Sequence, residues 1–412
     1  MKNTDRLFLG EGAVFPSDPE VSGINANTLV VGGTGTGKSM SIAAPLLINN
    51  RHHSMIIPIS KRKILTSCKP VLEEHDYNVQ VIDLDDGKLS TVGFNIFDYI
   101  KNDQDCMDFA KSISSDCAIK DDAYWENSVA DSISAMLYIL LLNSKLTGRT
   151  PTLETLHLLF RALSTRNSGI NDIKGTTLDP LFDKAEELFP DNYASGAWRT
   201  YSRVAEKTAS CIFSMISTCL APIFTDTVIK ASCLPSLNIA SIGSRKTALF
   251  ILTSTFDKTK NTYVNIIYST ILRVLMKTAE ASRSNRLKVP VQIIFDDFAC
   301  GTRIKDFDAY ISIFRSAGIS AIMLLQSEKQ LFDIYGEYGA DTILDNCDNY
   351  VYLGGNNTHT CEHISRRIDK PFKDIMNLEL RHVIVIRRGM KPFVTERYKI
   401  FEDPMCPRSL RG

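Results

Sequence analysis

The sequence predicts an α/β fold with a mostly parallel central sheet, into which an all-α domain is inserted. Short apolar runs of strand length recur without the alternation of half-exposed strands, as in parallel strands that are buried on both faces. Helical patterns lie between several of these runs. Residues 101–235, in contrast, contain helical stretches and no convincing strand.

The predicted strands lie on both sides of the insertion. They are Met55–Ile59, Val79–Leu84, Ala248–Leu252, Val289–Phe295, Ala321–Leu325, Tyr350–Leu353 and Val383–Ile386. Helices are expected between them, for example at Val264–Ala279 and Phe307–Ser316. We therefore expect residues 1–100 and 236–412 to form one discontinuous α/β domain.

Residues 101–235 form the expected all-α domain. Its predicted helices are Ser128–Asn143, Thr152–Ala162, Leu181–Glu187 and Ser202–Cys219. The polar stretch 164–177 is typical of a loop. The alternative is that these helices only elaborate the α/β core.

The composition is that of an ordinary soluble globular protein. Of its 412 residues, 44% are hydrophobic and 23% are charged, and the formal net charge is zero. A globally basic surface is thereby excluded, so any contact with nucleic acid must come from local patches. The ten cysteines include no Cys-x-x-Cys pair, which favours reduced thiols in a cytoplasmic protein.

No targeting or membrane segment is expected. The stretch MKNTDRLFLGEG is polar and lacks the apolar core of a signal peptide. The strongest apolar run, Ile133–Leu142, is far shorter than the roughly 20 residues that cross a bilayer.

The most informative motif follows a predicted strand, Thr28–Val31, and precedes a predicted helix, Met40–Ile48. It fits G-x-x-x-x-G-K-[ST] through Gly32, Gly33, Thr34, Gly35, Thr36, Gly37, Lys38 and Ser39. The backbone N–H groups of such a loop bind phosphate oxygens, helped by the helix amino terminus. Lys38 is expected to reach the β- and γ-phosphates, and Ser39 to ligate Mg²⁺. The sequence therefore predicts a site for ATP and Mg²⁺.

An acidic pair completes the predicted site. In VPVQIIFDDFA, a nearly continuous apolar run leads to Asp296 and Asp297. Asp296 is expected to hold Mg²⁺ through water, and Asp297 to orient the attacking water as a general base. The alternative is a solvated acidic turn.

Three weaker candidates are each open to two interpretations. Gln326 ends a predicted strand and is either a γ-phosphate sensor or a strand-end cap. Arg315 is either an ordinary ion-pair partner or, in a ring of subunits, an arginine finger. His359, Cys361 and His363 alternate as some metal ligands do, but a zinc site normally has four ligands.

Several stretches together resemble the type IV coupling proteins, ring-forming ATPases that feed DNA into conjugative type IV secretion systems. The strongest similarity lies in FDDFACGTRIKDFDAYISIFRSAGISAIMLLQS, residues 295–327. Other similar stretches are Pro45-Leu46-Leu47, GFNIFDY (93–99, with Ile96 in place of a proline), YWE (124–126), EKTASCIFSMIST (206–218), ILDNCDNYVYLGG (343–355) and RRGMKPF (387–393). The resemblance extends from about residue 8 to residue 403.

The resemblance implies a RecA-like P-loop domain, a helical domain that faces the substrate, and a homo-hexamer. It implies ATP-driven translocation of relaxase-bound single-stranded DNA. It also implies that membrane components of the secretion system hold the protein at the inner face of the cell membrane. It aligns Arg315 with the family's proposed arginine finger and Gln326 with its glutamine sensor.

This sequence departs from the family pattern in three places. No amino-terminal transmembrane helices are expected, Ile59-Ser60-Lys61-Arg62 stands in place of Asp-Pro-Lys-Gly, and Asp297 stands in place of a Glu. The last two departures touch the nucleotide site and together predict slow hydrolysis. Two other functions stay open: a receptor that binds ATP as an assembly switch, and another P-loop DNA translocase, which the helical insertion disfavours. The cluster KRK at 61–63 is either a DNA contact or a solvated charge run.

Overall fold

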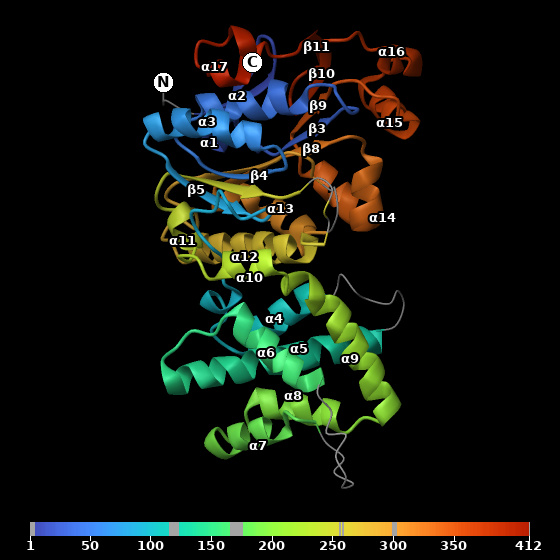
Figure 1. Cartoon of the computed structure of the whole chain (residues 1–412). Coiled ribbons are helices and arrows are strands. Elements are labelled where there is room, and N and C mark those ends of the chain that lie inside the picture. The colour runs from blue at the N-terminus through green and yellow to red at the C-terminus, as the bar shows by residue number, and fades with distance from the viewer. Residues whose placement is uncertain are drawn as a thin grey trace. The chain divides into compact units, whose positions relative to one another are not determined.

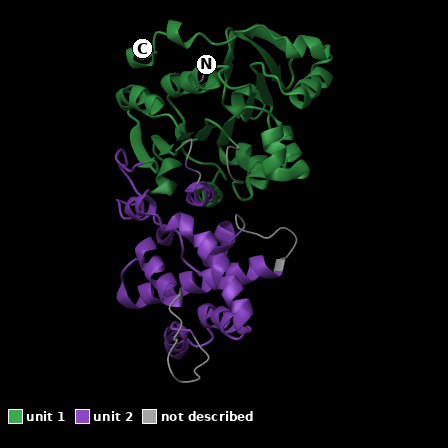
Figure 2. Cartoon of the chain, turned by 45° about the vertical axis from the view of Figure 1, so that its right-hand side comes forward, with its two compact units in different colours: residues 1–85, 238–256, 271–412 green, residues 86–237, 257–270 purple. Residues whose placement is uncertain are grey.

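The structure is a computed structural model that describes residues 5–114, 123–164, 176–254, 257, 259–298 and 303–411. Two compact units divide the chain (Figures 1 and 2). The first comprises Met1–Asp85, Asn238–Phe256 and Ile271–Gly412, and the second comprises Asp86–Leu237 and Asp257–Thr270. Most of the polar stretch 164–177 lies outside the described residues.

A nine-stranded sheet forms the centre of the first unit within the described residues. Its strands follow the order β11 (Phe393–Glu396), β10 (His382–Arg387), β9 (Asn349–Tyr352), β3 (Thr28–Val31), β8 (Ile319–Leu325), β7 (Val291–Phe295), β4 (Ser54–Ile59), β6 (Thr247–Leu252) and β5 (Asn78–Asp83). The strands from β9 to β5 all pair in parallel. Every residue of β3, β4, β6, β7, β8 and β9 is buried, which is why their sequences are almost continuously apolar. The predicted α/β class is confirmed.

Helices accompany the sheet in the first unit (Figure 1). They are α1 (Pro19–Ser22), α2 (Ala44–Asn49), α3 (Arg62–Glu74), α11 (Ile239–Ile242), α13 (Phe307–Ala317), α14 (Lys329–Asp345), α15 (Thr358–Ile368), α16 (Phe372–Met376), the 3₁₀ turn η5 (Ile400–Glu402) and α17 (Arg408–Arg411). Helix α12 (Asn261–Glu280) crosses from the second unit into the first at residue 271.

The register of the sheet brings four strand ends to one edge. Val31 of β3 pairs with Leu325 of β8 on one side and with Tyr352 of β9 on the other. Phe295 of β7 pairs with Met323 of β8. The segments that follow β3, β7, β8 and β9 therefore meet at the carboxyl edge, where open α/β sheets bind their ligands.

Three features of the strands escaped prediction. The run 383–386 does form a strand, β10, but it pairs antiparallel to β9 and to β11. An apolar run reports burial and not strand direction, which long-range pairing decides. Strand β11 is half-exposed, and the hairpin of β1 (Arg6–Gly10) and β2 (Ala13–Pro16) is too short to stand out.

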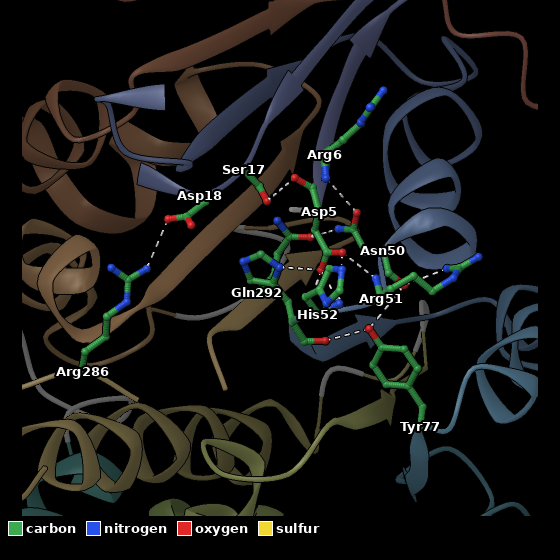
Figure 3. A network of polar contacts seen from close by, with 11 residues as sticks. Asp5, Arg6, Ser17, Asp18, Asn50, Arg51, His52, Tyr77, Arg286 and Gln292 are labelled. Atoms are coloured by element: carbon green, nitrogen blue, oxygen red, sulfur yellow. Dashed lines mark hydrogen bonds and ion pairs between the residues drawn. The ribbon is translucent and has the colours of Figure 1, made fainter. Parts of the chain in front are cut away.

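A buried carboxylate anchors the segment that leads into β1 (Figure 3). Asp5 is 4% exposed and accepts hydrogen bonds from the backbone N–H groups of Arg51, His52 and His53. Its Oδ2 also lies 2.6 Å from His53 Nδ1. The Tyr77 hydroxyl donates to the His53 carbonyl at 2.8 Å. These bonds fix the chain immediately before β4.

The second unit is helical throughout its described elements. They are the 3₁₀ turn η2 (Ile96–Asp98), α4 (Asp103–Ser114), α5 (Ala123–Thr147), α6 (Leu153–Ser164), α7 (Asp179–Leu188), α8 (Tyr193–Ser202), α9 (Glu206–Leu220), the 3₁₀ turn η4 (Ala221–Ile223) and α10 (Asp226–Ser232). The two segments by which the chain enters and leaves this unit are hydrogen-bonded to each other. Gly93 N donates to Pro235 O, and Leu237 N donates to Gly93 O.

The core of the second unit contains its longest helix, α5. By length and composition, Tyr124–Thr147 of α5 could cross a bilayer, with a mean hydropathy of 1.3 in its most apolar window. The bent pair Glu206–Ile223 and Asp226–Ser232 also passes as a broken span. In this structure 61% of the α5 window is buried inside the protein, so packing within the unit accounts for its apolar sequence.

Candidate nucleotide-binding site

The glycine-rich loop lies at the carboxyl edge of the sheet, between β3 and a π-helical turn, η1 (Ser39–Ala43), that continues into α2. Gly35 and Gly37 have φ values of 76° and 79°, which residues with a side chain rarely adopt. The Gly33 N–H donates to Gly354 O at 2.8 Å, so the segment after β9 supports the loop. The π turn is compatible with Pro45, which has no N–H for a regular helical bond.

Lys38 is folded onto this loop. Its Nζ donates to the carbonyls of Gly32 and Gly33 at 2.6 and 3.1 Å, and the residue is 8% exposed. The loop carbonyls thus satisfy a nearly buried ammonium group. A phosphate oxygen would be a stronger, charged acceptor for the same donor.

The two predicted metal ligands meet at the base of the loop. The Ser39 hydroxyl donates to Asp296 Oδ1 at 2.6 Å. Asp296 is 8% exposed, and its Oδ2 has no hydrogen-bond partner among the described residues. Burial raises the pKa of this carboxyl, and Asp297 adds to the effect, while Ser39, Lys61 and Lys38 oppose it. A hydroxyl beside a buried carboxylate with a spare oxygen fits water-mediated binding of Mg²⁺.

Asp297 occupies a strained turn directly after this carboxylate. Its φ is 72°, in the left-handed region that Asp and Asn tolerate better than most residues. The next residue locks the turn, because Phe298 N donates to Leu324 O at 2.8 Å. The Phe298 ring also packs against Phe295 and Phe307. The half-buried Asp297 is thereby held beside Asp296.

Gln326 faces the same loop. It is exposed, directly follows β8, and its Oε1 lies 3.4 Å from the hydroxyl of Thr34. Its backbone N–H donates to the Gln330 side chain at 2.9 Å. The predicted sensor residue therefore lies at the mouth of the loop.

Arg315 is elsewhere. It belongs to the last turn of α13 and precedes β8, whose first residue, Ile319, pairs with the first residue of β7. This is the amino edge of the sheet. There Arg315 is exposed, and its Nη2 donates to Gly23 O at 3.1 Å. The arginine is not brought to the phosphate-binding loop of its own chain.

The alternating His and Cys residues of α15 have separate partners. His359 contacts the Phe332 ring, and Cys361 contacts the Tyr352 hydroxyl. His363 Nδ1 lies 2.8 Å from the fully buried carboxylate of Glu328. Within the described residues no group of three His, Cys, Asp or Glu side chains is placed to hold a metal ion.

Sequence reasoning missed several residues at the site. Gly354 and Gly355 lie against Gly33, and the Gly-Gly pair directly after a predicted strand was a usable signal. In the KRK cluster, the charge of Lys61 lowers the pKa of Asp296, whereas Arg62 pairs with Asp83 and Asp85. No sequence pattern marked Arg397, whose side chain lies beside Gly37.

Comparison with known proteins identifies the family. The sequence profile of the type IV secretory system conjugative DNA transfer family matches residues 2–370. The chain belongs to this family. Among curated proteins, none matches significantly.

Solved structures share the fold of this conjugative DNA transfer protein. The bacterial conjugative coupling protein TrwBdeltaN70, in a trigonal form with sulphate, superposes with a TM-score of 0.71 at 17% identity, over 96% of this chain and 90% of that chain. Plasmid coupling protein TrwB in complex with ADP and Mg²⁺ gives 0.67 at 18% identity, over 96% and 90%. VirB4 of Thermoanaerobacter pseudethanolicus gives 0.58 at 12% identity, over 96% and 97%.

The conjugative DNA transfer family and its fold account for the arrangement of the site. The central strands place the glycine-rich loop and the acidic pair on either side of β8, with Gln326 at the end of β8 between them. A RecA-like P-loop domain and a helical unit are therefore the architecture of this chain.

Proposed function

We propose that this protein is an ATP-driven motor that moves single-stranded DNA, bound to a relaxase, into a type IV secretion system. The observation that carries the proposal is the contact between Ser39 and Asp296 beneath an intact phosphate-binding loop, in a chain of the conjugative DNA transfer family. TrwB has been solved with ADP and Mg²⁺ and with the ATP analogue ADPNP, which supports ATP and Mg²⁺ as ligands here.

Each site residue has a definite part in this proposal. The backbone of Gly32 to Gly37 binds phosphate oxygens, and Lys38 leaves the loop carbonyls to bind the β- and γ-phosphates. Ser39 and Asp296 hold Mg²⁺, which when bound offsets the charge that develops on the transferred phosphoryl group. Asp297 orients the attacking water and accepts its proton.

Two residues extend the proposed site beyond this core. Gln326 stands where it can contact the γ-phosphate and report its loss. Arg315, on the opposite edge of the sheet, acts on the nucleotide of a neighbouring subunit in a homo-hexamer, so that hydrolysis requires assembly. DNA contacts are expected to be with phosphates and therefore salt-dependent and independent of base sequence.

The helical unit is proposed to be an inserted domain, about residues 101–235, that faces the substrate. Its entering and leaving segments pair at Gly93 and Leu237, which supports an independent insertion. We propose that excising about residues 105–230 with a short linker leaves an α/β core that binds nucleotide but no longer responds to DNA. An unfolded core would instead assign the region to the main domain.

The proposed site of action is the cytoplasmic face of the membrane, reached through membrane components of the secretion system. The decisive experiment is an ATPase assay with and without single-stranded DNA, combined with a mass measurement of the assembly. DNA-stimulated hydrolysis by a hexamer supports the motor. Nucleotide binding without hydrolysis in any assembly favours a receptor that uses ATP as an assembly switch, the alternative that Asp297 keeps open.

A further inference from the structure

We propose that Arg397 is a nucleotide-binding residue whose guanidinium group bonds the α- and β-phosphates of the bound nucleotide. The proposal rests on the nucleotide-binding function proposed above and adds to it a residue outside the glycine-rich motif. It starts from the juxtaposition of Arg397, just after β11, with Gly37 in the loop.

The sheet delivers Arg397 to the loop. Glu396, the last residue of β11, pairs with His382, the first residue of β10, and β10 runs antiparallel to β9. Arg397 therefore emerges at the carboxyl edge of the parallel strands. A Cβ atom placed on Gly37 would lie 3.8 Å from Arg397 Nη1 and 3.6 Å from Ser41 Oγ. The guanidinium group is thus next to the half of the loop that leads into η1.

Only part of this guanidinium group is satisfied. Its Nη2 donates to Leu353 O at 3.1 Å, which fixes its orientation at the end of β9. Its Nε is buried and has no hydrogen-bond partner among the described residues, and no carboxylate in that part of the chain forms an ion pair with it. Burial without a compensating negative charge lowers the pKa of Arg397. An anion bound beside Gly37 would supply that charge.

The place of Arg397 along the loop indicates which phosphates its guanidinium group would contact. Gln326 touches Thr34, near the start of the loop, whereas Arg397 lies beside Gly37, close to where the loop becomes the helix. The backbone of a P-loop cradles the α- and β-phosphates, which ADP and ATP share. Arg397 should consequently contribute to the binding of both nucleotides alike and should not distinguish them.

The test compares ADP and ATP affinities of the full chain with those of an Arg397→Gln variant, by calorimetry with Mg²⁺. Glutamine removes the charge but retains an N–H that can donate to Leu353 O. Both affinities should fall by about tenfold or more, as expected for lost charge-assisted bonds. The matched control is Lys391→Gln, which removes a charge from the β10–β11 turn at the opposite edge of the sheet.

A second variant guards against misfolding. Arg397→Lys keeps the charge but not the planar fork, so its loss of affinity should be smaller than that of Arg397→Gln. Unchanged ADP affinity in Arg397→Gln, or a loss for ATP alone, would overturn the assignment. If the unmodified chain binds neither nucleotide, the nucleotide-binding function itself fails. If it binds both, and Lys38→Ala weakens binding while Arg397→Gln leaves both affinities unchanged, only the role of Arg397 fails.

Discussion

The hydroxyl of Ser39 lies 2.6 Å from Asp296 Oδ1, although 257 positions separate the two residues. Ser39 begins the helical turn after one strand, and Asp296 directly follows another strand, two places away in the sheet. The contact joins the phosphate-binding loop to the acidic pair. Because both oxygens suit Mg²⁺, it also marks where the cation is expected to bind.

We expect Ser39→Ala and Asp296→Asn each to abolish most of the tightening of ADP binding by Mg²⁺. The two residues act on one cation, so the double variant should be scarcely worse than the more severe single variant. Calorimetric titration with Mg²⁺ and with chelator measures the effect. Affinities in chelator serve as the control and should change little. A full Mg²⁺ effect in both single variants would place the cation elsewhere.

Replacing Lys38 by Ala should weaken ATP binding by at least an order of magnitude, or about 1.4 kcal/mol. The variant loses the ammonium group that would exchange the Gly32 and Gly33 carbonyls for phosphate oxygens. Equilibrium binding and thermal melting of the nucleotide-free chain should be compared, with Lys391→Ala as the matched loss of charge. Unaltered ATP affinity would remove the loop from the mechanism.

Asp297→Asn should abolish hydrolysis and leave ATP binding intact, because Lys38 and Asp296 are untouched. Asparagine tolerates the φ of 72° as aspartate does, so the turn should survive. Asp297→Glu tests the reach of the carboxylate: higher turnover would mean that the aspartate is too short. The left-handed backbone and the locked Phe298 instead favour a drop. Single-turnover hydrolysis and ATP affinity separate these outcomes, and full activity in Asp297→Asn would exclude this carboxylate as the base.

Arg315 should matter for turnover and little for ATP binding by one subunit. An Arg315→Ala subunit retains its own loop, and a Lys38→Ala subunit retains its arginine. Mixing the two should restore part of the hydrolysis, since each supplies what the other lacks. Mass measurements must verify that mixed assemblies form. Mixed assemblies no more active than either variant alone would argue against action between subunits.

Asp5 should make folding stability sensitive to acid. Burial by itself raises the pKa of this carboxyl, but the bonds from His53, Arg51 and His52 outweigh it, and the pKa lies below its usual value of 3.8. The carboxylate therefore contributes stability that is fully present above pH 3.8 and lost as the pH falls through the lower folded-state value.

The comparison for Asp5 is thermal unfolding of the wild type and Asp5→Asn between about pH 6 and about pH 3, a range that includes the usual carboxyl pKa of 3.8. The advantage of the wild type should shrink with acidification. Asp5→Ala, which leaves three backbone N–H groups without their acceptor, should cost about 3 kcal/mol or more at pH 6. A constant difference between wild type and Asp5→Asn across the range would contradict the assignment (Figure 3).

Local sequence determined the features of this protein that depend on neighbouring residues. The glycines that adopt a left-handed backbone and the Lys-Ser end of the loop can be predicted from sequence, because a P-loop is one continuous segment. The continuous apolar runs predicted the parallel strands, since a strand that is covered on both faces does not alternate apolar with polar residues. Asp296 could be predicted because the strand before it, β7, is another buried and nearly continuous apolar run.

Tertiary structure alone decided the features that depend on which strand ends meet. The direction of β10 brings Arg397 beside Gly37. The packing of α15 places His363 within hydrogen-bond distance of Glu328. Arg315 and Gln326 lie close in sequence, yet β8 carries them to opposite edges of the sheet. The physical reason is that burial and hydrogen bonding across the sheet choose partners over hundreds of residues, whereas a sequence pattern records only local preferences.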